Sequence, residues 1–372
     1  MFGKRIGFLS VVFFLVLVAS ALGEIQVNEF DVNLHGRWWH VLSYWVQDDL
    51  LIYPADNTFL EPEGLAFADG ILYVSGDRGQ FETDSRLALY SHPPGGTLTF
   101  SGYLQMTLAP DGWGPEGLVF NNSGSGYGSG VSQLVSVELD GGGQTGIIDL
   151  ITGNVTDNLT ISPAEDVAYV ASESRFATLE DAGGPVTVTF YDQTFVPTGD
   201  TITVAPATNG MVSVSASFAS FLTRTTVAGE CLLTVTKENP GNAINVYDLQ
   251  GAAIGDQQDL PVEPEARIPI GGGFYLTRPA FLTVEAVTVN EAEQVIYVGD
   301  EDNTMVHVFT PGLLVGDIDG DGDKDMDDVI AFVAVLLDDP MDPKHVDRSD
   351  INADMLVNGL DTQFFVDAVT GP

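Results

Sequence analysis

Short apolar runs, separated by clusters of turn residues, fill the chain between residues 24 and 311. The runs are rich in Val, Ile, Tyr and Phe, and Gly, Pro, Asn and Asp gather between them. Runs of this kind indicate β-strands, and no long stretch of the region has the periodicity of an amphipathic helix. The pattern therefore predicts an all-β domain over residues 24–311.

A pair of strands recurs within this all-β region. Each copy joins an apolar strand, a turn and a second strand, and carries acidic residues at fixed places. Three copies cover residues 63–77, 157–173 and 285–301, and residues 115–120 open a fourth. A third strand follows each pair, so a unit of three or four antiparallel strands returns about every 50 residues, which is typical of a β-propeller.

The length of the region predicts the number of blades. Residues 24–311 give about 48 residues for each of six blades, so we predict six, with five or seven as alternatives. Strands within residues 38–53 are expected to complete the last blade and close the ring. A two-sheet β-sandwich is the alternative fold, but it does not require an acidic residue to return at the same strand position.

The first residues have the order of a secretory signal peptide. Lys4 and Arg5 precede an apolar run over residues 8–18, and small residues follow within residues 19–23. A membrane anchor is the alternative, but the run is shorter than the roughly 20 residues that span a bilayer. We expect residues 1–23 to be removed, and the mature chain to be secreted or at the cell surface without a membrane span.

The charge of the chain limits its partners. It contains 53 Asp and Glu against 13 Lys and Arg, a formal net charge of −40. Such a surface repels nucleic acid phosphates and anionic lipids, so we expect neither as a partner, whereas it suits cations. The scarcity of basic residues also argues against a polyphosphate substrate.

A second domain is predicted over residues 312–372, because every acidic residue from there on is Asp. An EF-hand-type calcium loop places oxygen ligands at alternate positions and at its last position, and needs a glycine at a sharp turn. A loop that begins at Asp317 has Gly322 at this turn. The ligands predicted for Ca²⁺ in this first loop are Asp317, Asp319, Asp321, Asp323, Asp325 and Asp328.

A second loop begins 33 residues after the first, at Asp350. Met355 stands where the first loop has glycine, so we expect a strained turn and weaker binding of Ca²⁺. An acidic, solvated loop without metal is the alternative for both loops. The ligands predicted for the second loop are Asp350, Asn352, Asp354, Asn358 and Asp361.

Apolar residues within 329–337 and 364–369 lie on one helical face after each loop, so each loop is expected to lead into a helix. This arrangement over residues 316–372 resembles type I dockerins. The resemblance implies a module that folds on calcium and binds a cohesin-like partner. The positions that read the partner in that family fall on Met326, Asp327, Gly359 and Leu360, which are not the hydroxyl pairs of cellulosomal dockerins. Attachment to the cell surface, or a purely stabilising role, therefore stays open.

The segments at residues 62–79 and 284–302 look like parts of phytase-like and esterase-like propeller domains. That resemblance implies acidic channel residues that handle phosphate or ester substrates, often with calcium. The candidate catalytic residues are Glu63, Glu116, Glu285, Asp77 and Arg78.

Further acids recur in the repeats and are expected to meet near one mouth of the channel. Asp157 is expected at the start of a first strand, as are Glu63, Glu116 and Glu285; Glu173 and Glu301 are expected at the end of a second strand, as is Asp77. The alternative is that these carboxylates bind backbone N–H groups and join the blades. His307 is expected to be structural, because it lies within a strand.

Together these features predict an all-β propeller followed by a small α-helical calcium module. We expect a secreted binding or anchoring component of an extracellular, polysaccharide-degrading assembly, with a glycan or small molecule bound at the propeller. A metal-assisted hydrolase that uses the acidic ring is the alternative.

Overall fold

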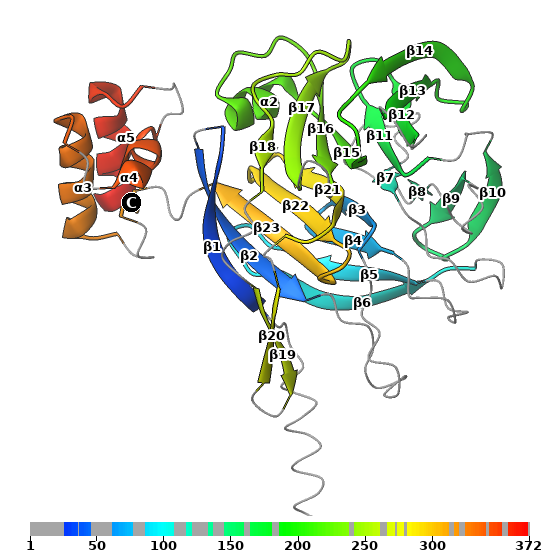
Figure 1. Ribbon diagram of the computed structural model, residues 1–372, viewed down its shortest axis with the longest axis horizontal. Helices are drawn as coiled ribbons and strands as arrows, with labels where there is room; N and C mark the ends of the chain where they lie inside the picture. Colours follow the sequence, from blue (N-terminus) through cyan, green and yellow to red (C-terminus); the bar gives the residue numbers. More distant parts are fainter. Residues whose placement is uncertain are drawn as a thin grey trace, which may run out of the picture.

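The structure is a computed structural model that describes residues 26–35, 37–45, 62–76, 86–107, 117–120, 133–136, 145–159, 164–180, 186–237, 242–260, 266–271, 274–278, 281–311, 316–319, 324–339, 342–351 and 356–370. The expected signal peptide lies outside these residues. Figure 1 shows a β-rich body with a group of three helices beside it: α3 (Met326–Leu336), α4 (Pro343–Ser349) and α5 (Gly359–Thr370).

The β-rich body consists of antiparallel sheets, which we number as blades in chain order. Blade 1 contains β3 (Gly64–Ala68), β4 (Ile71–Ser75), β5 (Arg86–Ser91) and β6 (Thr99–Gln105). Blade 2 contains β7 (Leu118–Phe120), β8 (Gln133–Ser136), β9 (Thr145–Asp149) and β10 (Val155–Leu159). Blade 3 contains β11 (Asp166–Val170), β12 (Arg175–Glu180), β13 (Thr187–Tyr191) and β14 (Pro197–Thr203). Blade 4 contains β15 (Thr208–Val214), β16 (Cys231–Thr236), β17 (Ala243–Asp248) and β18 (Gln258–Asp259).

Blade 5 joins the two ends of the β domain. Its strands β21 (Val284–Asn290), β22 (Val295–Asp300) and β23 (Met305–Pro311) come from the end of the domain, and β2 (Arg37–Trp45) and β1 (Gln26–Leu34) come from its start. Strand β2 pairs with β23 over Trp39–Trp45, with Val41 opposite Phe309. The prediction that N-terminal strands close the last blade is therefore confirmed for residues 38–45, and residues 46–53 lie outside the described residues.

The first strand of each blade lines the centre of a closed ring. Strand β3 contacts β7, β7 contacts β11, β11 contacts β15, β15 contacts β21, and β21 contacts β3. The described residues thus form a propeller of five blades, and the prediction of six is wrong. One reason is that β19 (Ala266–Gly271) and β20 (Phe274–Arg278) pair only with each other, so this hairpin lengthens the chain without adding a blade.

The largest core cluster lies between blades 4 and 5 and the helix α2 (Ala216–Thr223), which connects β15 to β16. Ser215 caps the start of α2, because its hydroxyl accepts a hydrogen bond from the backbone N–H of Phe218 at 3.1 Å. Phe218 and Leu222 pack into the core beside Trp39 of β2. The helix ends at Arg224, which has a left-handed backbone with φ of 53°.

The C-terminal helices have a separate small core. Ile318, Ala331, Phe332 and Phe365 are buried there, and the rings of Phe332 and Phe365 stack with centroids 4.2 Å apart. A helix follows each of the two predicted loops, as the apolar faces indicate, and α4 between them is an element that the pattern did not predict. Across the described residues, no helix is long and apolar enough to cross a membrane.

Candidate functional site

Three of the predicted acids meet where the first strands of the blades begin. Glu63 precedes β3, Glu285 is the second residue of β21, and Glu301 follows β22. Carboxylate oxygens of the three lie within 4.8 Å of one another, a spacing that could hold a cation. We call this side of the propeller the acidic end.

An ammonium group already lies in this cluster. Lys237, which follows β16, donates a hydrogen bond to Glu285 and forms an ion pair with it. With its amide turned so that the oxygen faces the lysine, Asn209 accepts a second hydrogen bond from Nζ at 3.0 Å. Burial alone would lower the pKa of Lys237, but the hydrogen bond and charge of Glu285, with the charges of Glu301 and Glu165, outweigh it and raise the pKa. A metal ion bound there would compete with this lysine.

The other residues predicted for the acidic ring do not lie in this cluster or are outside the described residues. Glu116, Asp77 and Arg78 lie outside the described residues. Asp157 was placed wrongly, because β10 is the outermost strand of blade 2, and Glu165 is the acid that precedes the first strand of blade 3.

Glu173 was also placed wrongly. It lies in the turn between β11 and β12, where it pairs with Arg175, and not at the end of a second strand. Both errors come from taking the outer strand of one blade for the first strand of the next.

The backbones of neighbouring blades approach closely at the acidic end. A Cβ atom on Gly117 would lie 2.5 Å from the Cα of Asp166, and one on Gly210 would lie 2.9 Å from the Cα of Ala286. A Cβ on Gly299 would lie 2.5 Å from the carbonyl oxygen of Pro62. Because real Cβ atoms are not found this close to backbone, glycine permits a tight contact between blades here.

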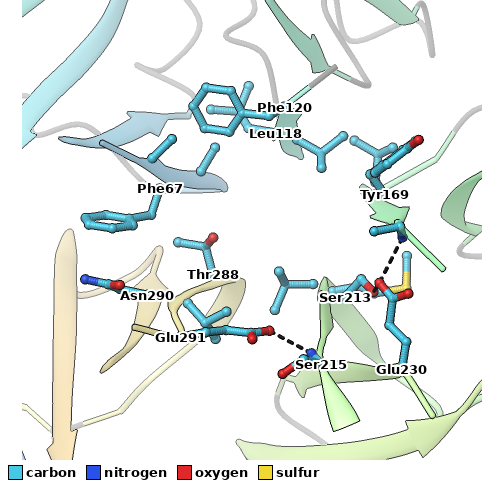
Figure 2. Close-up of a pocket in the computed structure, with 18 of the residues that line it drawn as sticks. Phe67, Leu118, Phe120, Tyr169, Ser213, Ser215, Glu230, Thr288, Asn290 and Glu291 are labelled. Carbon is cyan, nitrogen blue, oxygen red and sulfur yellow. Dashed lines mark hydrogen bonds between the residues drawn. The ribbon is translucent and has the colours of Figure 1, made fainter. Parts of the chain in front are cut away.

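The opposite end of the channel is open. A cavity of about 690 Å³ lies where the first strands of the five blades end, and we call it the channel cavity. Figure 2 shows Phe67, Phe120 and Tyr169 on its walls, facing a more polar wall from blades 4 and 5. Phe120 is buried, and Phe67 and Tyr169 are half-buried. The polar groups that line the cavity are Asp69, Ser172, Ser213, Ser215, Glu230, Thr288, Asn290 and Glu291.

Two carboxylates of the channel cavity are held in place by hydrogen bonds across blades. Glu230 accepts from the backbone N–H groups of Ala171 at 2.9 Å and Ser172 at 2.6 Å, and from the Ser213 hydroxyl at 2.5 Å. Glu291 accepts from the backbone N–H of Ser215 at 2.7 Å (Figure 2). Their orientation is therefore fixed by the protein itself, which would lower the entropy cost of binding a ligand.

Sequence reasoning missed this cavity, although the repeat carries a signal for it. In the sequence of each repeat an acid or amide, at residues 63, 116, 165, 209 and 285, is followed four positions later by residues 67, 120, 169, 213 and 289. These later residues, which include Phe67, Phe120 and Tyr169, all line the cavity. One repeat thus places acids at one end of the channel and rings at the other.

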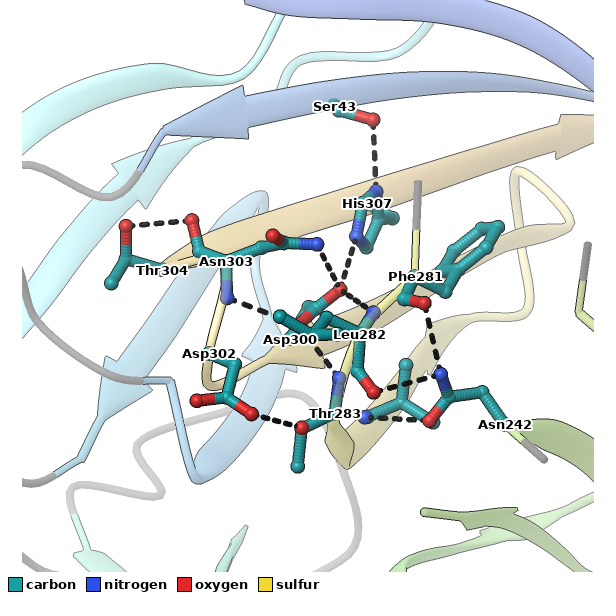
Figure 3. A network of polar contacts seen from close by, with 11 residues as sticks. Ser43, Asn242, Phe281, Leu282, Thr283, Asp300, Asp302, Asn303, Thr304 and His307 are labelled. Atoms are coloured by element: carbon teal, nitrogen blue, oxygen red, sulfur yellow. Dashed lines mark hydrogen bonds and ion pairs between the residues drawn. The ribbon is translucent and has the colours of Figure 1, made fainter. Parts of the chain in front are cut away.

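A Ser, a His and an Asp lie in line within blade 5 (Figure 3), but the structure rules out a nucleophile there. The carboxylate of Asp300 accepts from Nε2 of His307 at 3.3 Å, and Nδ1 of His307 is 2.8 Å from the hydroxyl oxygen of Ser43. All three side chains are fully buried, so no substrate reaches the hydroxyl. His307 is structural, as its place in the strand indicated.

Asp300 also fixes the chain around it. It accepts from the backbone N–H groups of Leu282 at 2.9 Å, Thr283 at 3.1 Å and Asn303 at 3.2 Å, and from the side-chain amide of Asn303 at 2.9 Å. Figure 3 shows these contacts converging on one carboxylate, which joins the entry to β21 with the turn after β22.

In the first predicted calcium loop, Asp317, Asp319 and Asp328 have carboxylate oxygens within 4.8 Å of one another. Asp317 and Asp328 are buried, and Asp328 accepts from the backbone N–H groups of Ile318 and Asp319 at 2.5 and 3.1 Å. Buried carboxylates at this spacing repel each other, and hard oxygen ligands suit Ca²⁺. The described residues therefore fit the predicted ion, while Asp321 and Asp323 lie outside them.

Asp325 has a further contact. Its side chain accepts from the backbone N–H of Asp327 at 2.7 Å and caps α3, and its own N–H donates to Asp328 at 2.8 Å.

The second loop repeats these contacts. The N–H of Asn358 donates to Asp361 at 2.9 Å, and the side chain of Asn358 accepts from Leu360 at 2.8 Å. Asp361 and Asp350 are buried, and Asn352 and Asp354 lie outside the described residues. Arg224, at the end of α2, lies 3.6 Å from the carboxylate of Asp350 and connects the propeller to this loop.

Comparison with known proteins finds only distant similarity to solved structures. No family model matches the chain, and no curated protein matches it. An auxiliary nutrient binding protein from Bacteroides thetaiotaomicron is 12% identical, with a TM-score of 0.37 over 73% of this chain and 76% of that one. One from Bacteroides ovatus is 11% identical, with a TM-score of 0.39 over 77% and 66%. A GH43 β-1,3-galactosidase is 11% identical, with a TM-score of 0.42 over 76% and 60%.

Proposed function

We propose that this chain is an exported binding protein whose propeller binds a short saccharide in the channel cavity. The observation that carries the proposal is the composition of that cavity. Aromatic rings on one side can pack against the apolar faces of sugar rings, and oriented carboxylates on the other can accept hydrogen bonds from sugar hydroxyls. Its volume of about 690 Å³ lies within the range of roughly 300–1,000 Å³ that is usual for small-ligand pockets.

The C-terminal module has a second part in the proposal. Asp317, Asp319 and Asp328 would hold one Ca²⁺ ion in the first loop, and Asp350 and Asp361 would contribute to a weaker site in the second. The bound ions would neutralise buried carboxylates and fix the loops against the two helices. The resemblance of the module to dockerins supports a role in attaching the chain to a cohesin-like partner or to the cell surface.

A metal-assisted phosphate or ester hydrolase is the second candidate, and the convergence of Glu63, Glu285 and Glu301 favours it. A catalytic cation needs an open position for water or substrate. At the acidic end the ammonium of Lys237 takes up part of the negative charge, and the blades pack tightly. These two features support binding at the cavity over catalysis at the acidic end.

The test compares variants at the two ends of the channel in the full chain. Calorimetric titration with a panel of neutral oligosaccharides, and turnover of phosphate and carboxylic esters with Ca²⁺, would be measured for the wild type, Tyr169→Ala and Glu63→Gln. We expect saccharide binding that Tyr169→Ala weakens at least tenfold and Glu63→Gln leaves unchanged. Ester turnover that only Glu63→Gln removes would replace the binding function with the hydrolase.

A further inference from the structure

We infer that the channel cavity binds the end of a neutral saccharide chain and not its interior, an inference that rests on the proposed binding function. The carrying observation is that the cavity opens at one end and is lined at the other by buried apolar side chains, next to the ion pair of Lys237 with Glu285. A chain that enters the cavity must therefore stop inside it. A ligand that continued past the site on both sides would need an exit that the described residues do not provide.

The filled end begins at the floor of the cavity. Leu118, Val167 and Met211 line the cavity at the positions of the first strands nearest the acidic end, and all three are buried. Beyond them lie the ion pair of Lys237 with Glu285 and the glycine contacts that bring the backbones of adjacent blades together. Threading a polymer through would require breaking a partly buried ion pair and separating blades, both of which cost free energy.

The open end is polar and exposed. Asp69, Ser172 and Glu291 lie in turns that follow the first strands, and all three are exposed at the rim. Phe120 lies deeper and is buried. An entering chain end would therefore place its terminal ring among Phe67, Phe120 and Tyr169, with later units nearer the rim carboxylates.

The charge of the cavity selects among chain ends. Its described lining includes the carboxylates of Asp69, Glu230 and Glu291 and no Lys, Arg or His. A uronic acid, sulfate or phosphate at the chain end would meet only like charge, which the net charge of −40 strengthens. The ligand class is therefore a neutral oligosaccharide, recognised by its end.

The experiment measures binding to the full chain by calorimetry. The probes are linear gluco-, xylo-, manno- and galacto-oligosaccharides of two to six units, the soluble polymers of the same linkages, and cyclic gluco-oligosaccharides, which have no ends. We expect the affinity for the preferred linear series to rise with length and then stay constant. A polymer should bind in proportion to the concentration of its chain ends, and cyclic forms at least tenfold more weakly than linear ones.

Two variants separate this inference from the proposed function. Tyr169→Ala should weaken binding of linear probes at least tenfold, and Lys237→Gln, at the filled end, should leave it unchanged. Polymer binding that follows mass and not chain ends, or cyclic probes that bind as well as linear ones, would overturn end recognition while leaving a saccharide-binding protein. No binding of any probe by the wild type would overturn the binding function and this inference together.

Discussion

Replacement of Asp300 by alanine should be among the most destabilising changes in the propeller. The carboxylate accepts from the backbone N–H groups of Leu282, Thr283 and Asn303, from the Asn303 amide and from His307, and it is fully buried. Each buried donor left without an acceptor costs about 1–3 kcal/mol, and this carboxylate satisfies several such donors. The full sum of these costs is not expected, because a water molecule that enters the space would satisfy some donors. We therefore expect a loss of about 3–5 kcal/mol in the free energy of unfolding.

An exposed aspartate of another blade gives a matched control. Asp192, in a turn of blade 3, also accepts from several donors: Thr194 N at 2.8 Å, Val196 N at 3.0 Å and the Thr194 hydroxyl at 2.7 Å. It is exposed, so water replaces its carboxylate in the alanine variant, and the loss should be much smaller. Denaturant unfolding of the wild type, Asp300→Ala and Asp192→Ala measures the difference. Equal losses in the two variants would refute the argument from burial.

Three other predictions follow from contacts at the blade and domain boundaries. Gly117→Ala should lower the free energy of unfolding by about 1–3 kcal/mol, measured by denaturant titration, because its Cβ would overlap Asp166. Burial raises the pKa of Asp166 in the folded protein well above its usual value. Its stabilising contribution is therefore present below the pKa of Asp166 in the unfolded chain, near 3.8, and is lost as the pH rises through the pKa in the folded protein. The loss of stability in Asp166→Asn should accordingly be larger at pH 4 than at pH 7. Arg224→Gln should loosen the module from the propeller in calcium-free buffer, seen as faster proteolysis after residue 311, and Ca²⁺ bound at Asp350 should reduce the difference.

The β class and the closure of the ring could be predicted because they depend on local pattern. Strand-forming runs recur along the whole domain. Strand β2, at the start of the domain, belongs to none of the first four blades and pairs with β23 in the last blade. The number of blades could not be predicted from length, because length does not say which strands pair. The hairpin β19–β20 pairs outside every blade, and β10 was mistaken for the start of a blade.

The candidate site could also be predicted only where it follows from the repeat. The repeat places Glu63 and Glu285 at the start of first strands, so their meeting at one end follows from the register of the propeller. Lys237 follows a second strand and has no counterpart in the repeat that the sequence shows, so its ion pair could not be predicted. The open cavity depends on how far apart the backbones of the blades lie, which the sequence does not give. The one sequence feature that indicates the cavity is the set of rings at the same position of the repeat: Phe67, Phe120 and Tyr169.

The two acidic clusters of the chain should differ in their response to calcium. At the acidic end Lys237 lies among the glutamates, whereas in the first loop Asp317 and Asp328 are buried within 4.8 Å of each other and of Asp319. Calcium at 100 times its dissociation constant should stabilise the module by about 2.7 kcal/mol. Thermal unfolding of the full chain in chelator and in Ca²⁺ measures this shift, which Asp317→Asn should reduce and Glu63→Gln should leave unchanged. If Glu63→Gln removed the shift and Asp317→Asn did not, the acidic end of the propeller, and not the loop, would be the calcium site.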